Sequence, residues 1–141
     1  MIFTVTGGRG FIGSHFVEKV LREGHTVIDI DKMTYASSKS LTCDLNPNYS
    51  HIKEDICDLT HIPVCDVFVN FAAESHVGNS IIDSTEFVNT NVAGVKNLLD
   101  LIRRKPENCS RRPLLMHIST DEVYGDIEKG DHIETDILKP S

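Results

Sequence analysis

The chain lacks the features that mark several large classes of protein. No apolar run in its 141 residues approaches the ~20 residues of a membrane-spanning helix, so we expect no membrane partner. The first residues form an apolar strand at once, without the basic segment and apolar core of a signal peptide, so we expect no secretory leader and a cytoplasmic location. Lys and Arg number 14 against 21 Asp and Glu, giving a formal net charge of −7, which argues against a nucleic-acid partner.

Metal and redox motifs are also missing. Cys43, Cys57, Cys65 and Cys109 show no C-x-x-C spacing, so we expect reduced thiols. His76 has no histidine or carboxylate at ligand spacing, and we expect no metal site. The chain has no internal repeat and no low-complexity segment. Its 40% hydrophobic and 25% charged residues are ordinary for a globular protein, and we expect one domain over residues 1–141.

An alternation of strands and helices fills the chain. Apolar, β-branched runs predict strands at 2–6, 26–30, 50–53, 67–71 and 114–119, and helical spacing predicts helices at 11–22 and 87–104. Such alternation predicts an α/β fold, a Rossmann-like doubly wound parallel sheet that is incomplete on its C-terminal side.

Three connections in this pattern carry further expectations. Residues 32–49 are polar and predict a loop, as do residues 106–113. Only about a dozen residues, Pro63 among them, join the strand at 50–53 to the next, which is near the lower limit for a parallel crossover. We expect a loop or a single turn there and a less covered sheet edge. The inner side of the helix at 87–104 is expected to carry Val88, Val92, Val95, Leu98, Leu99 and Ile102.

Three glycines lie directly after the first strand. Gly7, Gly10 and Gly13 precede an amphipathic helix with the spacing G-x-x-G-x-x-G. In a dinucleotide-binding turn the first glycine permits a tight turn, the second lets the backbone approach the pyrophosphate, and the third lets the helix pack close to the strand. Free N–H groups and the helix dipole then favour an anion at the helix N-terminus. The order of strand, turn and helix predicts a dinucleotide site, with an ordinary tight turn as the alternative.

An acidic residue closes the second strand. Asp31 stands 18 residues after Gly13. A carboxylate at this place accepts hydrogen bonds from the adenosine ribose and repels a 2′-phosphate, which favours NAD over NADP. The alternative is a solvated loop acid.

Segments further along the chain carry a resemblance to a known family. The sequences Asp-Lys-Met-Thr-Tyr-Ala at 31–36, Asn-Phe-Ala-Ala-Glu-Ser-His-Val at 70–77 and Ser-Thr-Asp-Glu-Val-Tyr-Gly at 119–125 resemble nucleotide-sugar 4,6-dehydratases of the extended short-chain dehydrogenase/reductase family. Those acting on dTDP-glucose are the nearest match, and the similarity runs over residues 1–141. Related epimerases and decarboxylases share the glycine turn but lack the adjacent Asp-Glu after Thr.

The resemblance implies an activity, the NAD-dependent dehydration of a nucleotide-activated glucose to its 4-keto-6-deoxy sugar. Hydride leaves C4, water is eliminated across C5 and C6, and the hydride returns to C6. By the same resemblance Glu122 is the base for the C5 proton, Asp121 the acid for the C6 hydroxyl, and Thr120 hydrogen-bonds near the 4-hydroxyl. Two adjacent carboxylates beside a sugar can have separated pKa values, as this chemistry needs. The alternative is that the two acids cap a turn.

Other site residues follow from the same comparison. The expected cofactor contacts are Gly7, Gly10, Phe11, Ile12, Gly13, Asp31, Lys32, Asp55, Ile56, Phe71, Ala72, Ala73, Asn91 and Ser119. The expected substrate contacts are Ser75, His76 and Thr120. A helix asparagine facing solvent is the alternative for Asn91. Gly78 departs from the family, which usually has Asp at that position.

A further departure concerns the hydride step. By the resemblance, residues 134–141 match the loop that leads into the family's Tyr-x-x-x-Lys pair, so the catalytic pair is expected beyond Ser141. Within these residues that spacing occurs at Tyr35 and Lys39, in the polar stretch after the second strand, whereas Tyr124 is followed at that spacing by Glu128. We therefore expect no turnover by the isolated chain. A cofactor-binding module without chemistry and a related epimerase or decarboxylase stay open as alternatives, as does the choice between dTDP and UDP. Family dimers pair through helices like that at 87–104, which implies a homodimer by analogy.

Overall fold

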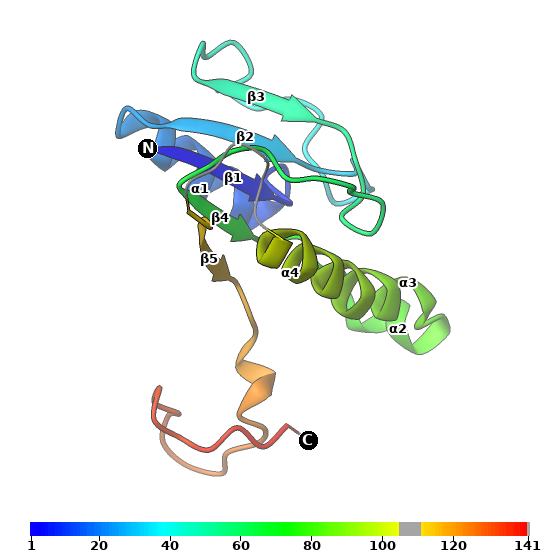
Figure 1. The fold of residues 1–141 in the computed structure, drawn as a ribbon. Coiled ribbons are helices and arrows are strands. Elements are labelled where there is room, and N and C mark those ends of the chain that lie inside the picture. The colour runs from blue at the N-terminus through cyan, green and yellow to red at the C-terminus, as the bar shows by residue number, and fades with distance from the viewer. Residues whose placement is uncertain (105–110, 141) are drawn as a thin grey trace.

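The fold is a parallel sheet of five strands. The computed structural model describes residues 1–104 and 111–140. Its strands are β1 (Ile2–Thr6), β2 (Thr26–Ile30), β3 (Tyr49–Ile52), β4 (Val67–Asn70) and β5 (Leu114–His117). They lie in the order β3-β2-β1-β4-β5, and every neighbouring pair is parallel (Figure 1). The predicted α/β doubly wound sheet is confirmed, and the strand order reverses between β1 and β4.

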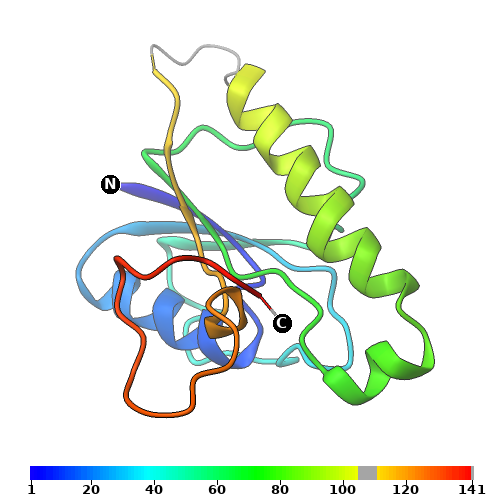
Figure 2. The ribbon, with the colours of Figure 1, turned by 90° about the horizontal axis from the view of Figure 1, so that it is seen from below.

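Helix α1 (Phe11–Arg22) covers one face of the sheet, and its bounds match the prediction. It begins straight after the glycine turn, and Gly24 at φ +80° follows its end. Its buried side chains Val17 and Val20 pack with Val5, Val27 and the other residues of one apolar core. Figure 2 shows the strands passing between α1 and the long helix on the other side. The sheet therefore has a separate core on each face.

The second core contains the short crossover. No helix or strand lies between β3 and β4, as predicted for this connection. The expected less covered edge is found at β3, which has no buried residue and where Ile52 is exposed, but the loop itself buries apolar side chains against α4 (Val95–Arg104). Ile56, Leu59 and Ile62 from the loop join Phe68 of β4 and Leu98 of α4 in one cluster. A loop thus supplies the apolar side chains that a helix supplies in longer parallel crossovers.

The predicted helix at 87–104 is interrupted. The short helix α2 (Val77–Ile82) precedes it. The segment itself begins at the end of the short helix α3 (Thr85–Val88), continues as a π-helical segment at Asn89–Gly94, and is α-helical again in α4. A π turn contains more residues than an α turn, so side chains before it point in other directions than an uninterrupted α-helix would give them. Its last residue, Gly94, lies against Ile56, whose side chain would be 2.7 Å from a Cβ at that position.

This interruption corrects the predicted inner face. Leu98 and Ile102 are buried and Val95 is partly buried, but Val88, Val92 and Leu99 are exposed. The prediction assumed one uninterrupted 3.6-residue period across the π segment. Leu101, which was not predicted, is buried in its place.

The bounds of β1 and β2 match the prediction, the ends of β3, β4 and β5 differ from it by one or two residues, and the loop after β2 is confirmed. Cys109 and most of the predicted loop at 106–113 lie outside the described residues, as does Ser141. Among the described residues, no helix is long and apolar enough to span a membrane.

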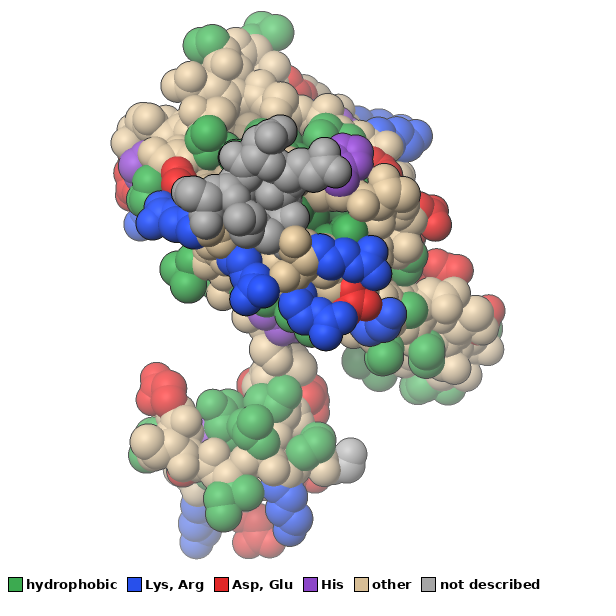
Figure 3. Space-filling model, viewed as in Figure 1, with side chains coloured by type: hydrophobic (Ala, Val, Ile, Leu, Met, Phe, Trp, Pro, Cys, Tyr) green, Lys and Arg blue, Asp and Glu red, His purple; other side chains and the backbone are tan. Residues whose placement is uncertain are grey.

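Residues 118–140, here the C-terminal arm, leave the sheet after β5 (Figure 1). Figure 3 shows the arm as a separate lobe joined to the body by a narrow neck, with hydrophobic side chains on the side in view. Within it, the ring of Tyr124 stacks on His132, whose ring nitrogens lie 3.1 Å from Asp136 Oδ2 and 3.2 Å from the Gly125 carbonyl. The arm is held mainly by contacts within itself.

Candidate functional site

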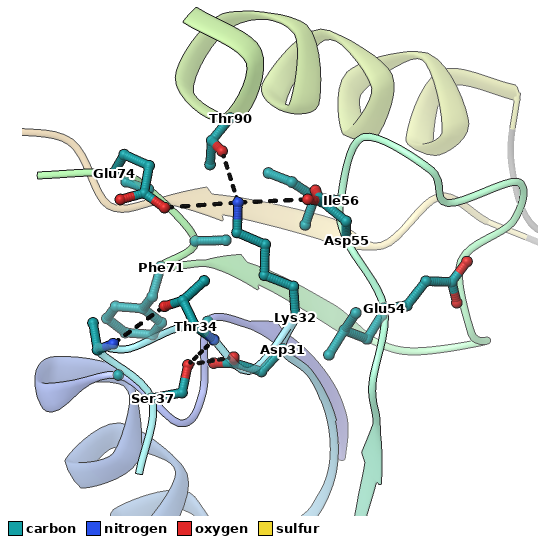
Figure 4. Close-up of a pocket in the computed structure, with 16 residues that line it drawn as sticks. Asp31, Lys32, Thr34, Ser37, Glu54, Asp55, Ile56, Phe71, Glu74 and Thr90 are labelled. Carbon is teal, nitrogen blue, oxygen red and sulfur yellow. Dashed lines mark hydrogen bonds and ion pairs between the residues drawn. The ribbon is translucent and has the colours of Figure 1, made fainter. Parts of the chain in front are cut away.

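A pocket opens at the carboxyl ends of β1, β2 and β4, where the strand order reverses. Open α/β sheets bind ligands at this place. The lining residues are Gly7, Gly10, Ile30, Asp31, Lys32, Thr34, Ala36, Ser37, Glu54, Asp55, Ile56, Phe71, Ala72, Ala73, Glu74 and Thr90. Figure 4 shows the labelled side chains coming together from the segments after β2, β3 and β4 and from the π-helical segment.

The glycine turn forms the floor of the pocket. Gly7 has φ +70°, and a Cβ there would lie 2.7 Å from the amide nitrogen of Ala72. A Cβ on Gly13 would lie 2.2 Å from the Gly7 carbonyl oxygen. Gly10 precedes α1 without a side-chain cap, and no acidic residue stands in the first turn. The amides of residues 7–10 already donate to acceptors within the protein, so the backbone N–H groups offered to an anion are those of the first turn of α1, where no acidic side chain competes for them.

Asp31 lies beside this turn, almost fully buried. Its Oδ2 accepts from the Arg9 amide at 3.1 Å, and its Oδ1 accepts from the Met33 amide at 2.8 Å and the Ser37 hydroxyl at 2.7 Å. Met33 adopts φ +63°, an uncommon conformation for a residue with a side chain, and its N–H bond to Asp31 holds it there. Three donors thus fix the carboxylate in the pocket wall.

Lys32 gathers three acidic side chains on the opposite wall. Its Nζ donates to Thr90 Oγ1 at 3.2 Å and lies 3.5, 3.6 and 3.7 Å from carboxylate oxygens of Asp55, Glu74 and Glu86 (Figure 4 draws the first three). Burial alone would lower the pKa of Lys32, but these acids raise it above its usual value. Burial likewise opposes the ionised Asp55, yet the Cys57 amide and Lys32 hold the pKa of Asp55 below its usual value. The cluster joins the loops after β2, β3 and β4 to α3 and the π-helical segment.

The structure brings many of the predicted cofactor residues together. Nine of them line the pocket, namely Gly7, Gly10, Asp31, Lys32, Asp55, Ile56, Phe71, Ala72 and Ala73. Gly13 lies buried beneath the turn, whereas Phe11 and Ile12 are exposed at the start of α1. Ser75, His76 and Ser119 are exposed and lie outside the pocket lining, and His76 directly precedes α2.

Asn91 makes a contact that the sequence does not reveal. Its side chain accepts from the amide of Glu74 at 2.9 Å and donates to the carbonyl of Glu74 at 2.8 Å. It therefore clamps the segment after β4 instead of only facing solvent. The buried Thr90 beside it lines the pocket, and sequence reasoning missed it because a single helix threonine gives no motif.

The predicted reaction residues lie on the arm, away from the pocket lining. Thr120 Oγ1 accepts from the Glu122 amide at 3.2 Å and caps a 3-10 turn at Asp121–Val123. Both carboxylates are exposed. Thr120 caps this turn, whereas the turn-capping alternative assigned the cap to the two acids, and the acid and base roles of Asp121 and Glu122 stay predictions.

Comparison with known proteins places the chain in a family. The family model described as GDP-mannose 4,6 dehydratase matches residues 4–141, and the chain belongs to this family. Its relatives include the low-salt glycan biosynthesis protein Agl12 of Haloferax volcanii, 42% identical over 143 residues that cover 96% of this chain and 44% of the relative. The dTDP-glucose 4,6-dehydratase of Neisseria meningitidis is 38% identical, covering 94% of this chain and 41% of the enzyme.

Solved structures agree with this placement. DesIV, a dTDP-glucose 4,6-dehydratase from Streptomyces venezuelae solved with NAD and TYD bound, superposes with a TM-score of 0.85 at 38% identity, covering 99% of this chain and 46% of DesIV. A UDP-galactose 4-epimerase superposes with a TM-score of 0.78 at 28% identity, covering 99% of this chain and 45% of the epimerase. The chain spans less than half the length of these relatives.

Proposed function

We propose that this chain is the cofactor-binding part of an NAD-dependent nucleotide-sugar 4,6-dehydratase that acts on dTDP-glucose. The observation that carries the proposal is the glycine turn with Asp31 at the reversal point of the sheet. Relatives with 37–38% sequence identity over 99% of this chain were solved with NAD bound, which supports the same cofactor here.

The pocket residues fit a dinucleotide. Gly7 and Gly13 leave no room for a Cβ, so the backbone can lie close to a pyrophosphate at the start of α1. Asp31 is placed to accept hydrogen bonds from the ribose hydroxyls of the adenosine half. Asp55 and Ile56 lie on the side where the adenine would be held, and Ala72 and Ala73 leave the backbone after β4 open to the cofactor.

The proposed reaction assigns proton transfers to the arm. Bound NAD supplies the hydride acceptor and donor. Glu122 takes the proton from C5 of the sugar while Asp121 gives a proton to the departing C6 hydroxyl, so that water leaves and a C5–C6 double bond forms. Thr120 orients the sugar through its 4-hydroxyl. These roles require the arm to lie over the sugar, with its carboxylates removed from bulk water.

A second candidate function is cofactor binding without chemistry. The exposed carboxylates and the turn-capping Thr120 favour it for the isolated chain. An epimerase or decarboxylase is less favoured, because the adjacent Asp121 and Glu122 suit an elimination. The predicted homodimer stays a prediction that sedimentation equilibrium would test.

Calorimetric titration of the purified chain with NAD+ tests the proposal. We expect saturable binding that weakens about tenfold or more in Asp31→Ala, because the ribose loses a charged hydrogen-bond acceptor. Asp126→Ala, on the exposed arm, is the matched control and should bind like the unmodified chain. A chain that is folded by circular dichroism but binds no NAD+ would contradict the proposal.

Turnover is tested separately. The isolated chain should form no 4-keto-6-deoxy sugar from dTDP-glucose and NAD+, since the Tyr-x-x-x-Lys pair of the family is expected beyond Ser141, and Tyr35 and Lys39, which share the spacing, lie exposed in the loop after β2. Product formation at rates typical of enzymes would overturn the expectation that further residues are needed.

A further inference from the structure

Arg9 occupies the middle of the glycine turn and is buried, with only 6% of its surface exposed. Its Nη2 donates to Asp44 Oδ1 at 2.5 Å, and its Nη1 donates to the carbonyls of Ser38 and Lys39 at 3.3 and 3.4 Å. Its Nε lies 3.8 Å from Asp29 Oδ2. All these contacts point the guanidinium into the loop after β2, and Arg9 is not among the residues that line the pocket.

This placement resolves a conflict in the sequence. An acid at the end of the second strand favours a ribose with free hydroxyls, whereas an arginine close by accommodates a 2′-phosphate. The chain has both, side by side, because the Arg9 amide itself donates to Asp31 Oδ2 at 3.1 Å. Arg9 is next to Gly10, which lines the pocket, and its amide meets Asp31, which also lines it, so a released Arg9 side chain would start at the edge of the pocket.

Asp44 is the partner that restrains the guanidinium. Its second oxygen accepts from the Leu41 amide at 2.9 Å, so the backbone also holds the carboxylate in place beside Arg9. The Leu41 amide and Arg9 outweigh the effect of burial and hold the pKa of Asp44 below its usual value, so it is charged at neutral pH. Asp29 is a weaker partner for Arg9, because its two oxygens already accept from the Gly8 amide and the Tyr49 hydroxyl.

We propose that Asp44 is a specificity-determining residue: by holding the Arg9 guanidinium out of the pocket, it keeps the site selective for NAD+ over NADP+. The inference rests on the proposed cofactor site. It assigns the selectivity to two residues, the acid that lines the pocket, Asp31, and the acid that withdraws the competing arginine, Asp44.

The test compares the ratio of dissociation constants for NADP+ and NAD+ in four chains by calorimetry. Asp44→Asn keeps an acceptor oxygen but removes the charge that holds the guanidinium, so a 2′-phosphate can compete for Arg9, and the ratio should fall about tenfold, the effect of one charge-assisted hydrogen bond. The double variant Asp44→Asn with Arg9→Met should return to the ratio of the unmodified chain. Asp58→Asn removes an exposed charge elsewhere and should leave the ratio unchanged.

Several results would overturn the inference. An unchanged ratio in a folded Asp44→Asn chain would do so, and so would a gain for NADP+ that survives the removal of Arg9. In both cases NAD+ binding by the unmodified chain persists and the proposed function stands. A folded, unmodified chain that binds no NAD+ would instead overturn the proposed function together with the inference.

A comparison in the unmodified chain does not depend on the folding of variants. Adenosine 2′,5′-bisphosphate should bind at least about tenfold more weakly than adenosine 5′-monophosphate, because the pocket offers its 2′-phosphate the Asp31 carboxylate and no free guanidinium. Equal or tighter binding of the bisphosphate would show that Arg9 already reaches the pocket and would overturn the inference.

Discussion

The pocket and the C-terminal arm differ in how far along the chain their contacts reach. At the pocket, the Gly8 amide bonds to Asp29, 21 residues away, and Lys32 bonds to Thr90, 58 residues away. In the arm, the His132 contacts span four and seven residues. The predicted cofactor residues are thus placed by the whole sheet, and the predicted reaction residues by a local turn.

This difference separates binding from chemistry. A site held by contacts distant in sequence is formed when the domain folds, so its geometry is fixed before a ligand arrives. A carboxylate on a locally held segment depends on where that segment lies. We therefore expect the chain to have the binding property of its family more fully than the catalytic one, and three predictions test the contrast.

The largest effect is expected at the glycine turn. Gly13→Ala would place a Cβ 2.2 Å from the Gly7 carbonyl oxygen and 3.0 Å from the Gly8 Cα, both backbone atoms that cannot turn aside. We expect a loss of about 3 kcal/mol or more in the free energy of unfolding, measured by urea denaturation. Gly78→Ala, in α2, is the control, because its Cβ would meet only the His76 ring at 3.3 Å. Similar losses in both variants would contradict the contrast.

A pH-dependent effect is expected at Asp29 beneath the turn. Burial raises the pKa of Asp29 from 3.8 to about 6, with Asp31 adding to the rise and Tyr49, Arg9 and the Gly8 amide opposing it. The folded chain therefore binds this proton more tightly than the unfolded chain. The resulting stabilisation is fully present below the unfolded pKa and is lost as the pH rises through about 6.

Asp29→Asn isolates this contribution, because an amide accepts the Gly8 hydrogen bond without titrating. We expect the unfolding free energy of the unmodified chain minus that of Asp29→Asn to fall by about 2 kcal/mol between about pH 4 and pH 7. Urea denaturation at several pH values measures it, with Asp58→Asn as the control for an exposed acid. A difference that rises with pH, as it would for a carboxylate of lowered pKa such as Asp55, would show that the sign is wrong.

The sequence predicted the parts of the fold that local patterns determine. The glycine turn was predictable because a turn that excludes Cβ atoms requires glycines at fixed spacing. Asp31 was predictable because it directly follows an apolar strand. The short crossover was predictable as a loop from its length. Its packing was not, because the burial of Ile56 and Leu59 depends on α4, about 40 residues later.

The remaining misses have the same origin. The inner face of the long helix was misassigned because the π segment breaks the period, and that segment meets Ile56 from a distant loop at Gly94. Thr90 and Arg9 act through partners 35 to 58 residues away, with no spacing that would reveal them. Patterns of apolar and glycine residues thus predict elements and turns, whereas side-chain partners across the sheet emerge only from the fold.

The smallest effect is expected in the arm. His132→Ala removes the stacking on Tyr124 and both polar contacts of the imidazole, but these stay within the arm. We expect the free energy of unfolding to change by less than about 0.5 kcal/mol. His117→Ala is the matched variant in β5, where the ring lies 3.0 Å from the side-chain nitrogen of the buried Asn70. Losing that partner should cost about 1 kcal/mol. If His132→Ala cost as much as His117→Ala in the same urea titrations, the arm would be coupled to the sheet. Thr120, Asp121 and Glu122 would then be placed by the fold as firmly as the pocket is.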